Sequence, residues 1–301
     1  MKNDKRYSVG CDIGGSHISC GLIELTSGKM EPNSLVSVPV DNNDEKDIIL
    51  SAWAKAIGAC MKNLPSGAEM AGVGLAIPGP FDYEKGIGLY ENLNKKFVNM
   101  YHVNVRTELS RRLNISPDKF KFVNDATAFS LGAFWYGSGK GSKQMVGITL
   151  GTGFGSSFVS NGTAIEDGPT VPDEGCLWHI PYKEGIADDY FSTRWFVANF
   201  NERSTEQVTG VKRIAELAYS KNNLALEIFS EFGTNLADCL ADPLRNFNTD
   251  VVVMGGNIAE AFDLFRPSLT KALGDKKLDI QFKVSELKET AAMLGAATMF
   301  K

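Results

Sequence analysis

The stretch YSVGCDIGGSHISCGLI, residues 7–23, has a counterpart about half a chain later in MVGITLGTGFGSSFV, residues 145–159. In each, a short apolar run meets a turn rich in glycine and hydroxyl side chains, and a second apolar run follows. This pattern predicts a strand, a tight turn and a second strand. Two hairpins of one design, each opening one half of the chain, indicate two related α/β domains. We expect the two domains to face one central cleft.

Strand and helix patterns continue through both halves. Helical spacing of apolar residues predicts helices at 47–64, 126–135 and 289–300, and one or two long helices at 214–240. Continuous apolar runs predict buried strands at 71–77, 120–123 and 250–254. We therefore expect a small N-terminal domain, residues 1–121 with the C-terminal helix 289–301, and a larger domain of residues 122–288.

Bulk properties exclude several classes of protein. A length of 301 residues suits two domains, and a net charge of −5 argues against a basic nucleic-acid-binding face. No N-terminal signal is visible, and no apolar run approaches the roughly 18 residues of a membrane span. The five cysteines form no CxxC pair, which indicates reduced thiols in a cytoplasm and predicts neither a disulfide framework nor a zinc site: Cys11, Cys20, Cys60, Cys176 and Cys239.

The first glycine turn is a candidate phosphate site. Glycines let backbone amides approach a polyanion closely, because no Cβ stands in the way. Asp12, at the end of the leading strand, can hold Mg²⁺ through water. The alternative is an ordinary glycine hairpin with a capping Asp. We assign ATP binding here to Asp12, Gly14, Gly15 and Ser16.

The second glycine turn occupies the matching position in the other half. A dinucleotide-binding fingerprint requires a helix after the glycines, whereas residues 156–159 predict a strand. Paired with the first turn, this segment is better interpreted as the second half of a phosphate clamp. The residues assigned to ATP here are Gly151, Thr152, Gly153 and Gly155.

A third glycine segment, Gly255-Gly256-Asn257, follows the buried strand at 250–254. A helix that starts behind two glycines offers a flat backbone surface for a nucleotide base or ribose. A simple strand-to-helix turn is the alternative. We assign Gly255, Gly256 and Asn257 to ATP binding as well.

The Asn124-Asp125 pair stands at the end of a predicted strand. Phosphoryl transfer needs a residue that accepts the proton of the attacking hydroxyl, and Asp125 suits this role as the catalytic residue. Asn124 can orient a neighbouring substrate hydroxyl. The alternative is a helix N-cap, and both can hold if one residue caps while the other faces the substrate.

The segment Glu174 to His179 and the downstream Asp188 are candidate sugar-binding residues. An imidazole and carboxylates can exchange hydrogen bonds with sugar hydroxyls. For His179, the alternative is a partly buried side chain beside Trp178. We also place Gly79, in the Pro-Gly-Pro turn after residue 77, among the substrate-binding residues.

Together these motifs resemble the ROK family of sugar kinases (repressors, open reading frames and kinases), over nearly the whole chain. The family's phosphate turn matches residues 12–16, its second glycine loop 149–155, its catalytic Asn-Asp-Ala 124–126 and its adenosine turn 255–256. The resemblance implies a duplicated actin-like (ribonuclease H-like) fold, with ATP and Mg²⁺ as cofactors. It also implies a glucokinase-like transfer of phosphate to a sugar, with the 6-hydroxyl of a hexose or amino-hexose as the expected acceptor. We further expect a homodimer.

The sugar-binding segment departs from the family pattern, which is usually Gly-Glu-x-Gly-His. Alignment on His179 puts Cys176 in place of the Glu and Trp178 in place of the second Gly, while Glu174 lies two residues earlier. A further family carboxylate aligns with Asp188, and the Cys-rich zinc-binding insertion is missing. The identity of the sugar therefore stays open.

Two alternatives to an ATP-dependent sugar kinase also stay open. One is a catalytically weak sugar-binding sensor of the same fold, which the changes in the sugar-binding segment would suit. The other is a kinase that uses polyphosphate as the donor or an acylamino-sugar as the acceptor. No helix-turn-helix precedes Tyr7, so the DNA-binding branch of the family is not expected.

Overall fold

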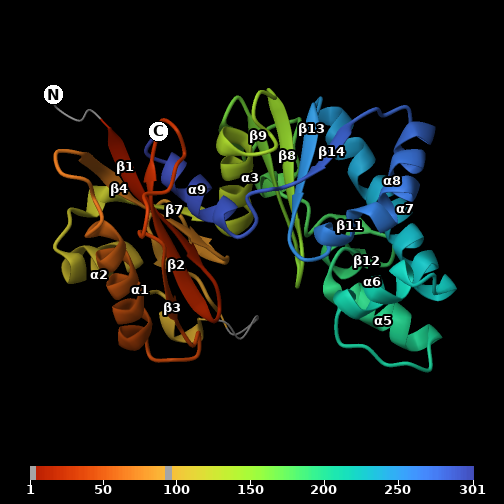
Figure 1. The fold of residues 1–301 in the computed structure, drawn as a ribbon, viewed down its shortest axis with the longest axis horizontal. Helices are drawn as coiled ribbons and strands as arrows, with labels where there is room; N and C mark the ends of the chain where they lie inside the picture. Colours follow the sequence, from red (N-terminus) through yellow and green to blue (C-terminus); the bar gives the residue numbers. More distant parts are fainter. Residues whose placement is uncertain (1–4, 92–96) are drawn as a thin grey trace. The chain divides into compact units, whose positions relative to one another are not determined.

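The computed structural model describes residues 5–91 and 97–301, which form two compact units (Figure 1). Unit 1 comprises Met1–Tyr136 and Glu289–Lys301, and unit 2 comprises Gly137–Lys288. The domain boundary predicted at residues 121 and 122 falls inside β7 (Phe120–Asn124), a strand of the unit 1 sheet. Strand β7 pairs with β4 (Glu69–Ile77). The C-terminal segment Glu289–Lys301 belongs to unit 1.

Unit 1 is built on a five-stranded sheet in the order β3-β2-β1-β4-β7. Strands β1 and β2 form the first predicted hairpin; β2 also pairs antiparallel with β3, whereas β1, β4 and β7 are parallel. The remaining strands of this unit are β1 (Arg6–Ile13), β2 (His17–Glu24), β3 (Val36–Pro39) and the short pair β5 (Phe81–Asp82) and β6 (Ile87–Gly88).

One face of the unit 1 sheet packs against α1 (Lys46–Met61). Because side chains alternate along a strand, Val9, Cys11 and Ile13 share this face with the buried apolar side of α1. Helix α1 shows the helical spacing predicted from the sequence, with Trp53 fully buried. Further helical segments of this unit are α2 (Val105–Leu113), α3 (Asp125–Tyr136), α9 (Thr290–Thr298), η1 (Val98–Met100) and η2 (Pro117–Lys119).

The other face of the sheet packs against α9, which also packs against α3. Glycines make the approach close: a Cβ on Gly10 would lie 1.9 Å from the carbonyl oxygen of Met293, and a Cβ on Gly74 1.9 Å from that of Ala296. Asp12 has the same strand parity as Gly10. Its side chain therefore lies on the face of the sheet that packs against α9. The segment that precedes α9 approaches the same face.

Unit 2 repeats this sheet. Its strand order is β10-β9-β8-β13-β14, with β8, β9 and β10 antiparallel and β8, β13 and β14 parallel. The arrangement matches β3-β2-β1-β4-β7 strand for strand, which confirms the predicted duplication. The bounds are β8 (Gln144–Leu150), β9 (Phe154–Ser160), β10 (Thr163–Ile165), β13 (Val251–Gly255) and β14 (Gln281–Val284).

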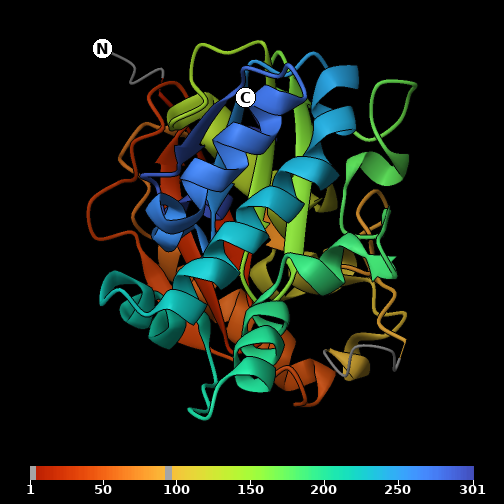
Figure 2. The same cartoon turned by 90° about the vertical axis from the view of Figure 1, so that its right-hand side faces the viewer.

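Helices cover one face of the unit 2 sheet, with α7 and α8 lying side by side (Figures 1 and 2). Val146, Ile148 and Leu150 of β8 point into their apolar core. The stretch 214–240, for which one or two helices were predicted, contains two, α6 and α7. The helical bounds are α4 (Ala187–Tyr190), α5 (Thr193–Arg203), α6 (Val211–Tyr219), α7 (Asn223–Asn246), α8 (Phe262–Asp275), η3 (Asp173–Gly175) and η4 (Ala259–Ala261).

A two-stranded sheet of β11 (Pro181–Tyr182) and β12 (Gly185–Ile186) joins η3 to α4. This connection carries the chain from the candidate sugar segment to Asp188. Over residues 5–91 and 97–301, none of the helices combines the length and the apolar character needed to cross a membrane.

Candidate active site

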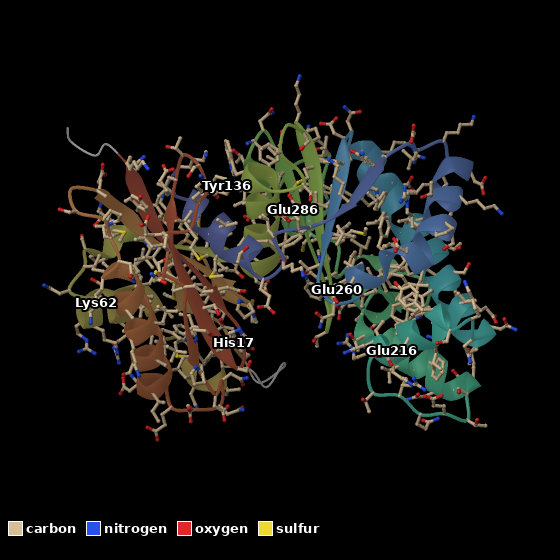
Figure 3. The ribbon with its side chains drawn as sticks, in the orientation of Figure 1. His17, Lys62, Tyr136, Glu216, Glu260 and Glu286 are labelled. Atoms are coloured by element: carbon tan, nitrogen blue, oxygen red, sulfur yellow. The ribbon has the colours of Figure 1, made fainter. Side chains whose placement is uncertain are left out.

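The first glycine turn joins β1 to β2 and is held by a residue from a distant loop. The backbone N–H of Gly14 donates to the carbonyl of His17 at 3.0 Å, and His17 begins β2 (Figure 3). The side-chain amide of Asn42 donates to the carbonyl of Gly15 at 2.8 Å. Ser16 is exposed, and its Oγ lies 3.1 Å from Nδ1 of His17. The uncharged side-chain amide of Asn42 thus holds the first glycine turn in place.

Three carboxylates of unit 1 are electrostatically coupled beside this turn. Asp12 lies near the end of β1, Asp125 begins α3, and Glu289 directly precedes α9. Burial, Asp125 and Glu289 raise the pKa of Asp12 from 3.8 to about 7. A hard divalent cation, which prefers oxygen ligands, would offset both the cost of burying the charge of Asp12 and its repulsion by the other two carboxylates. The donor set therefore fits the Mg²⁺ expected at Asp12.

Asn124 and Asp125 divide two tasks between them. Oδ1 of Asn124 accepts hydrogen bonds from the backbone N–H groups of Ala126 and Thr127 at 2.9 and 3.3 Å, so Asn124 caps α3. The Nδ2 of Asn124 donates to the hydroxyl of Tyr83 at 3.3 Å. Asp125 is exposed, and its Oδ1 also accepts from the N–H of Ala126, at 2.9 Å. The cap and the candidate base are therefore different residues.

Tyr83 connects this pair to the end of β4. Its hydroxyl donates to the carbonyl of Ile77 at 3.1 Å. A Cβ on Gly79 would lie 3.5 Å from the same hydroxyl, so Gly79 and Asn124 both lie near Tyr83. The hydroxyl of Tyr90 donates to the carbonyl of Pro78 at 3.0 Å. Two tyrosines thus fix the Pro-Gly-Pro turn that the sequence assigned to substrate binding.

The second glycine turn, between β8 and β9, is held from α5. Both the backbone N–H and the Oγ1 of Thr193 donate to the carbonyl of Gly151, at 2.8 and 2.9 Å. Within the turn, the N–H of Gly151 donates to the carbonyl of Gly153 at 3.1 Å. A Cβ on Gly151 would meet no heavy atom within 4 Å. This position therefore leaves room for a ligand to approach the backbone.

Asp188 contacts the second glycine turn. One carboxylate oxygen accepts from the backbone N–H of Phe154 at 2.6 Å, and the other accepts from the guanidinium of Arg194 at 2.6 Å. Arg194 also donates to the carbonyl of Thr152 at 3.1 Å. A Cβ on Gly153 would lie 2.9 Å from Asp188 Oδ1. The carboxylate that the sequence assigned to the sugar thus forms part of a charged support for the turn.

The third glycine segment lies next to the second turn. Gly256 has a φ of +85°, and a Cβ there would lie 2.3 Å from the carbonyl oxygen of Leu150. The N–H of Ile258 donates to the same carbonyl at 3.1 Å. Gly255 is buried in the sheet, whereas Gly256 and Asn257 are exposed. The structure therefore brings the predicted adenosine turn and the second phosphate turn together.

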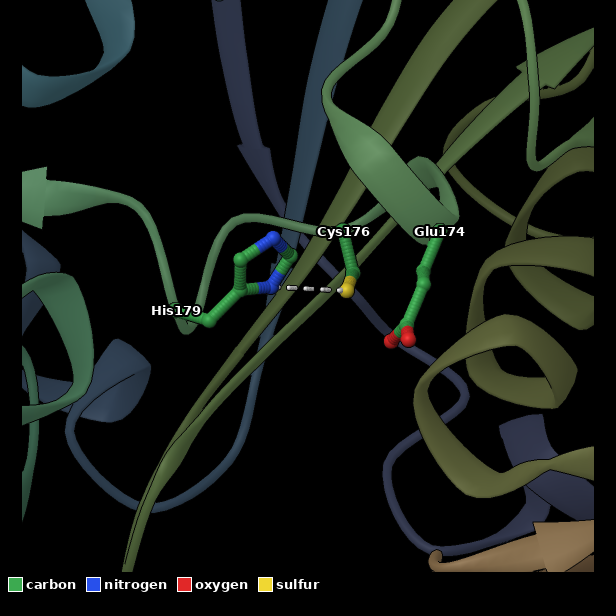
Figure 4. A group of neighbouring side chains, drawn as sticks. All are labelled: Glu174, Cys176 and His179. Atoms are coloured by element: carbon green, nitrogen blue, oxygen red, sulfur yellow. Dashed lines mark hydrogen bonds between the residues drawn. The ribbon is translucent and has the colours of Figure 1, made fainter.

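The candidate sugar segment places three donor side chains in one group (Figure 4). One ligand atom from each of Glu174, Cys176 and His179 lies within 4.8 Å of the others, and Cys176 Sγ is 3.6 Å from Nδ1 of His179. Burial and the charge of Glu174 raise the pKa of Cys176 to about 11. The ring of His179 lies edge-on to Trp178, with centroids 5.2 Å apart. Packing of His179 against Trp178 is thus compatible with a role of His179 in binding the sugar.

Several residues of these sites were not predicted from the sequence. Asn42 lies in a polar Asp-Asn-Asn-Asp turn, which gives no sign that it returns to Gly15. Tyr83 and Arg194 reach their partners through side chains, and Glu289 reaches Asp12 through the packing of α9. The one local signal was the position of Arg194, six residues after Asp188 at the start of a helix.

Comparison with known proteins gives consistent matches. The glucokinase of Thermotoga maritima is 28% identical over 324 residues, which cover 97% of this chain and 96% of that protein. The N-acetyl-D-glucosamine kinase of Photobacterium profundum is 26% identical over 290 residues, 90% of each chain. A ROK family glucokinase from Streptomyces griseus, solved in complex with glucose and AMPPNP, has a TM-score of 0.74 at 22% identity and covers 97% of this chain and 98% of its own.

These matches confirm the duplicated actin-like α/β fold and the resemblance drawn from the sequence motifs. The ROK family matches residues 8–301, which is nearly the whole sequence. The chain therefore belongs to the ROK family.

Proposed function

We propose that this chain transfers the γ-phosphoryl group of ATP to the 6-hydroxyl of a hexose or amino-hexose, with Asp125 as the general base. As a class, the chain is a carbohydrate kinase: its family and its relatives, which include glucokinases and N-acetyl-D-glucosamine kinases, support this together. One observation carries the proposal. Exposed Asp125, at the N-terminus of α3, is electrostatically coupled to Asp12 beside a glycine turn.

Asp125 would accept the proton of the sugar hydroxyl. As it does so, the hydroxyl oxygen would bond to the γ-phosphorus of ATP, and the bond between that phosphorus and the departing ADP would break. The protein need contribute little covalent chemistry to such a transfer beyond positioning and charge stabilisation. Asn124 supplies positioning, because its amide is held by the first turn of α3 and by Tyr83. These contacts fix the backbone from which Asp125 projects.

Asp12 would hold Mg²⁺ through water, with the charge of Asp125 and Glu289 nearby. When bound there, Mg²⁺ would supply positive charge that offsets the negative charge of the phosphates. The backbone amides of the two glycine turns would donate to the phosphates. Exposed Gly256 and Asn257 offer the neighbouring surface for adenosine.

Glu174 and His179, which the fold brings together, are our candidates for binding the sugar in unit 2, and Asn124 and Gly79 in unit 1. For Asp188 we propose a different task from the one the resemblance implied. Its carboxylate is already engaged by Phe154 and Arg194, so it would hold the second glycine turn in its ATP-binding form.

The test is a coupled assay for ADP release across a panel of hexoses, amino-hexoses and acylamino-sugars, with a matched preparation that lacks this chain as the control for contaminating kinases. We expect ATP-dependent and Mg²⁺-dependent turnover with at least one sugar. Polyphosphate in place of ATP tests the alternative donor. Sugar binding without ADP release from any member of the panel would instead identify a sensor.

Cys176 bears on the choice of sugar. It stands where the family carries a Glu, so a charged acceptor is missing unless Glu174 replaces it. A site that binds a hydroxyl discriminates strongly, whereas an apolar wall discriminates by about 1–3 kcal/mol per group. We expect glucose to be used with a high KM or to be surpassed by another sugar. Measurement of kcat/KM in Glu174→Gln and Cys176→Glu tests this; if glucose is the best substrate and Glu174→Gln leaves it unchanged, the idea is wrong.

A further inference from the structure

The segment Glu174 to His179 contains a carboxylate, a thiol and an imidazole whose donor atoms converge. Figure 4 shows the sulfur of Cys176 between the ring of His179 and the carboxylate of Glu174. Zn–S and Zn–N bonds of about 2.3 and 2.0–2.1 Å at a tetrahedral angle put the two donors roughly 3.5 Å apart. Sγ of Cys176 and Nδ1 of His179 are 3.6 Å apart. Cys176 and His179 therefore already have the spacing that a zinc ion requires, and a carboxylate oxygen of Glu174 lies within 4.8 Å of both donor atoms.

Backbone constraints produce this convergence. Glu174 has φ 60° and ψ 12°, a left-handed conformation that a residue with a Cβ rarely adopts. Gly175 is also left-handed, and a Cβ there would lie 2.2 Å from the carbonyl oxygen of Ile165. Beyond the turn, the N–H of buried Leu177 donates to Oγ of Ser156 at 2.7 Å. Strain of about 1–3 kcal/mol persists only where the surroundings impose it, and such strain clusters at ligand sites.

We propose that Glu174, Cys176 and His179 bind one divalent cation of the zinc class, through a carboxylate oxygen, Sγ and Nδ1. Thiolate and imidazole select zinc-like ions over Mg²⁺ and Ca²⁺. Three protein ligands leave a fourth position for water or another ligand. The site differs from the family's Cys-rich insertion, which this chain lacks. It also departs from the prediction of no zinc site, which rested on the lack of paired or clustered cysteines and on that missing insertion.

Binding would release the thiol proton of Cys176 to solvent, since the thiolate is the metal ligand. It would also fix the tautomer of His179: a metal on Nδ1 leaves the proton on Nε2, which can then donate a hydrogen bond outward. The metal would in this way hold the loop and orient the imidazole toward the sugar, and Glu174, when it is a metal ligand, would not bind a sugar hydroxyl directly. Metal binding itself does not depend on the proposed kinase activity.

The experiment uses the full chain, freed of metal with a chelator, without ATP or sugar. Co²⁺ is titrated while the thiolate-to-cobalt charge-transfer absorption is recorded, and Zn²⁺ affinity is measured by competition with a chromophoric chelator. We expect one equivalent of metal and a charge-transfer band. Cys176→Ser should abolish the band and weaken Zn²⁺ binding beyond the roughly 10–100-fold that loss of a group supporting a ligand costs.

Matched controls separate loss of a ligand from loss of charge or fold. Glu166→Gln removes a neighbouring carboxylate outside the group, and Cys239→Ser removes a distant thiol; both should keep the band and the stoichiometry. Exposed Glu174→Gln should weaken Zn²⁺ binding without unfolding the chain. The proposal is overturned if binding is substoichiometric, if no thiolate band appears, or if the band survives Cys176→Ser.

Discussion

The two glycine turns occupy equivalent places in equivalent sheets, yet they are supported by different chemistry. The turn in unit 1 follows Asp12, which is coupled to two further carboxylates, and a neutral amide from Asn42 holds it. The turn in unit 2 has Thr149 at the position matching Asp12, and its carboxylate comes from Asp188, paired with Arg194.

This difference indicates that the two glycine turns acquired different roles after one unit was duplicated. Carboxylates that repel one another favour a cation, so the first turn is suited to Mg²⁺ and to the base. At the second turn the charge of Asp188 is balanced by Arg194, and Thr193 holds the backbone. That turn is suited to donating amide hydrogens to phosphate oxygens.

The largest expected effect distinguishes Asp125, beside the first glycine turn, from Asp188, beside the second. Asp125→Asn keeps the acceptor for the N–H of Ala126 but removes the base, so we expect kcat to fall by about 10²–10⁴. Sugar affinity, measured by direct titration, should stay within a few-fold. The equivalent change in unit 2, Asp188→Asn, should reduce kcat far less. A near-normal kcat for Asp125→Asn rules out this residue as the base.

The next effect tests the charged support of the second turn. Asp188→Ala removes a charge-assisted hydrogen bond to Phe154, which is worth about 1.5–3 kcal/mol, or roughly 10–100-fold in kcat/KM for ATP. Asp188→Asn keeps an acceptor there and loses mainly the pairing with Arg194. Because that guanidinium is 59% exposed, the loss should be only a few-fold.

The kinetic parameter that moves decides between the two roles of Asp188. If it supports the turn, KM for ATP rises and KM for the sugar is little changed. A rise confined to the KM for the sugar would instead restore the sugar-binding role that the family resemblance implied.

A smaller effect is expected at the neutral support of the first turn. Asn42→Ala removes a hydrogen bond of 2.8 Å to Gly15, worth about 1 kcal/mol or roughly fivefold in KM for ATP. Asn43→Ala is the matched control, since its side chain bonds to Asp41 instead of the turn. Should Asn42→Ala impair ATP binding as much as Asp188→Ala, the proposed contrast between the two supports is lost.

These contrasts also show where sequence reasoning ends. The hairpins, the duplication and a helix cap within the Asn124-Asp125 pair were predictable, because apolar alternation, glycine turns and helix caps are local patterns; which of the two residues caps was left open. The support of Gly15 by Asn42 was not, since it depends on how the loop after β3 returns to the turn. The coupling of Glu289 to Asp12 was not either, because it requires the last helix to pack on the first sheet.

The smallest effect concerns the glycines themselves and tests whether phosphate approaches the backbone. A Cβ on Gly151 meets nothing within 4 Å, and one on Gly14 meets the carbonyl oxygen of His17 at 3.5 Å and its ring carbon Cε1 at 3.9 Å, both ordinary contacts. Neither glycine has a left-handed φ, so alanine fits both positions and should stabilise the free protein by up to about 0.4–1 kcal/mol.

Gly151→Ala should nevertheless raise KM for ATP by a few-fold, because the methyl group stands where phosphate oxygens approach the amides. Gly14→Ala should raise it less if the first turn acts mainly through a cation held by Asp12. Gly210→Ala, another position with open space around its Cβ, is the control: it should change thermal stability alone. Steady-state kinetics and thermal unfolding of the three variants provide the measurement. If Gly151→Ala leaves KM for ATP unchanged, phosphate does not approach that backbone, and the amide-donating role of the second turn fails whatever the support from Asp188.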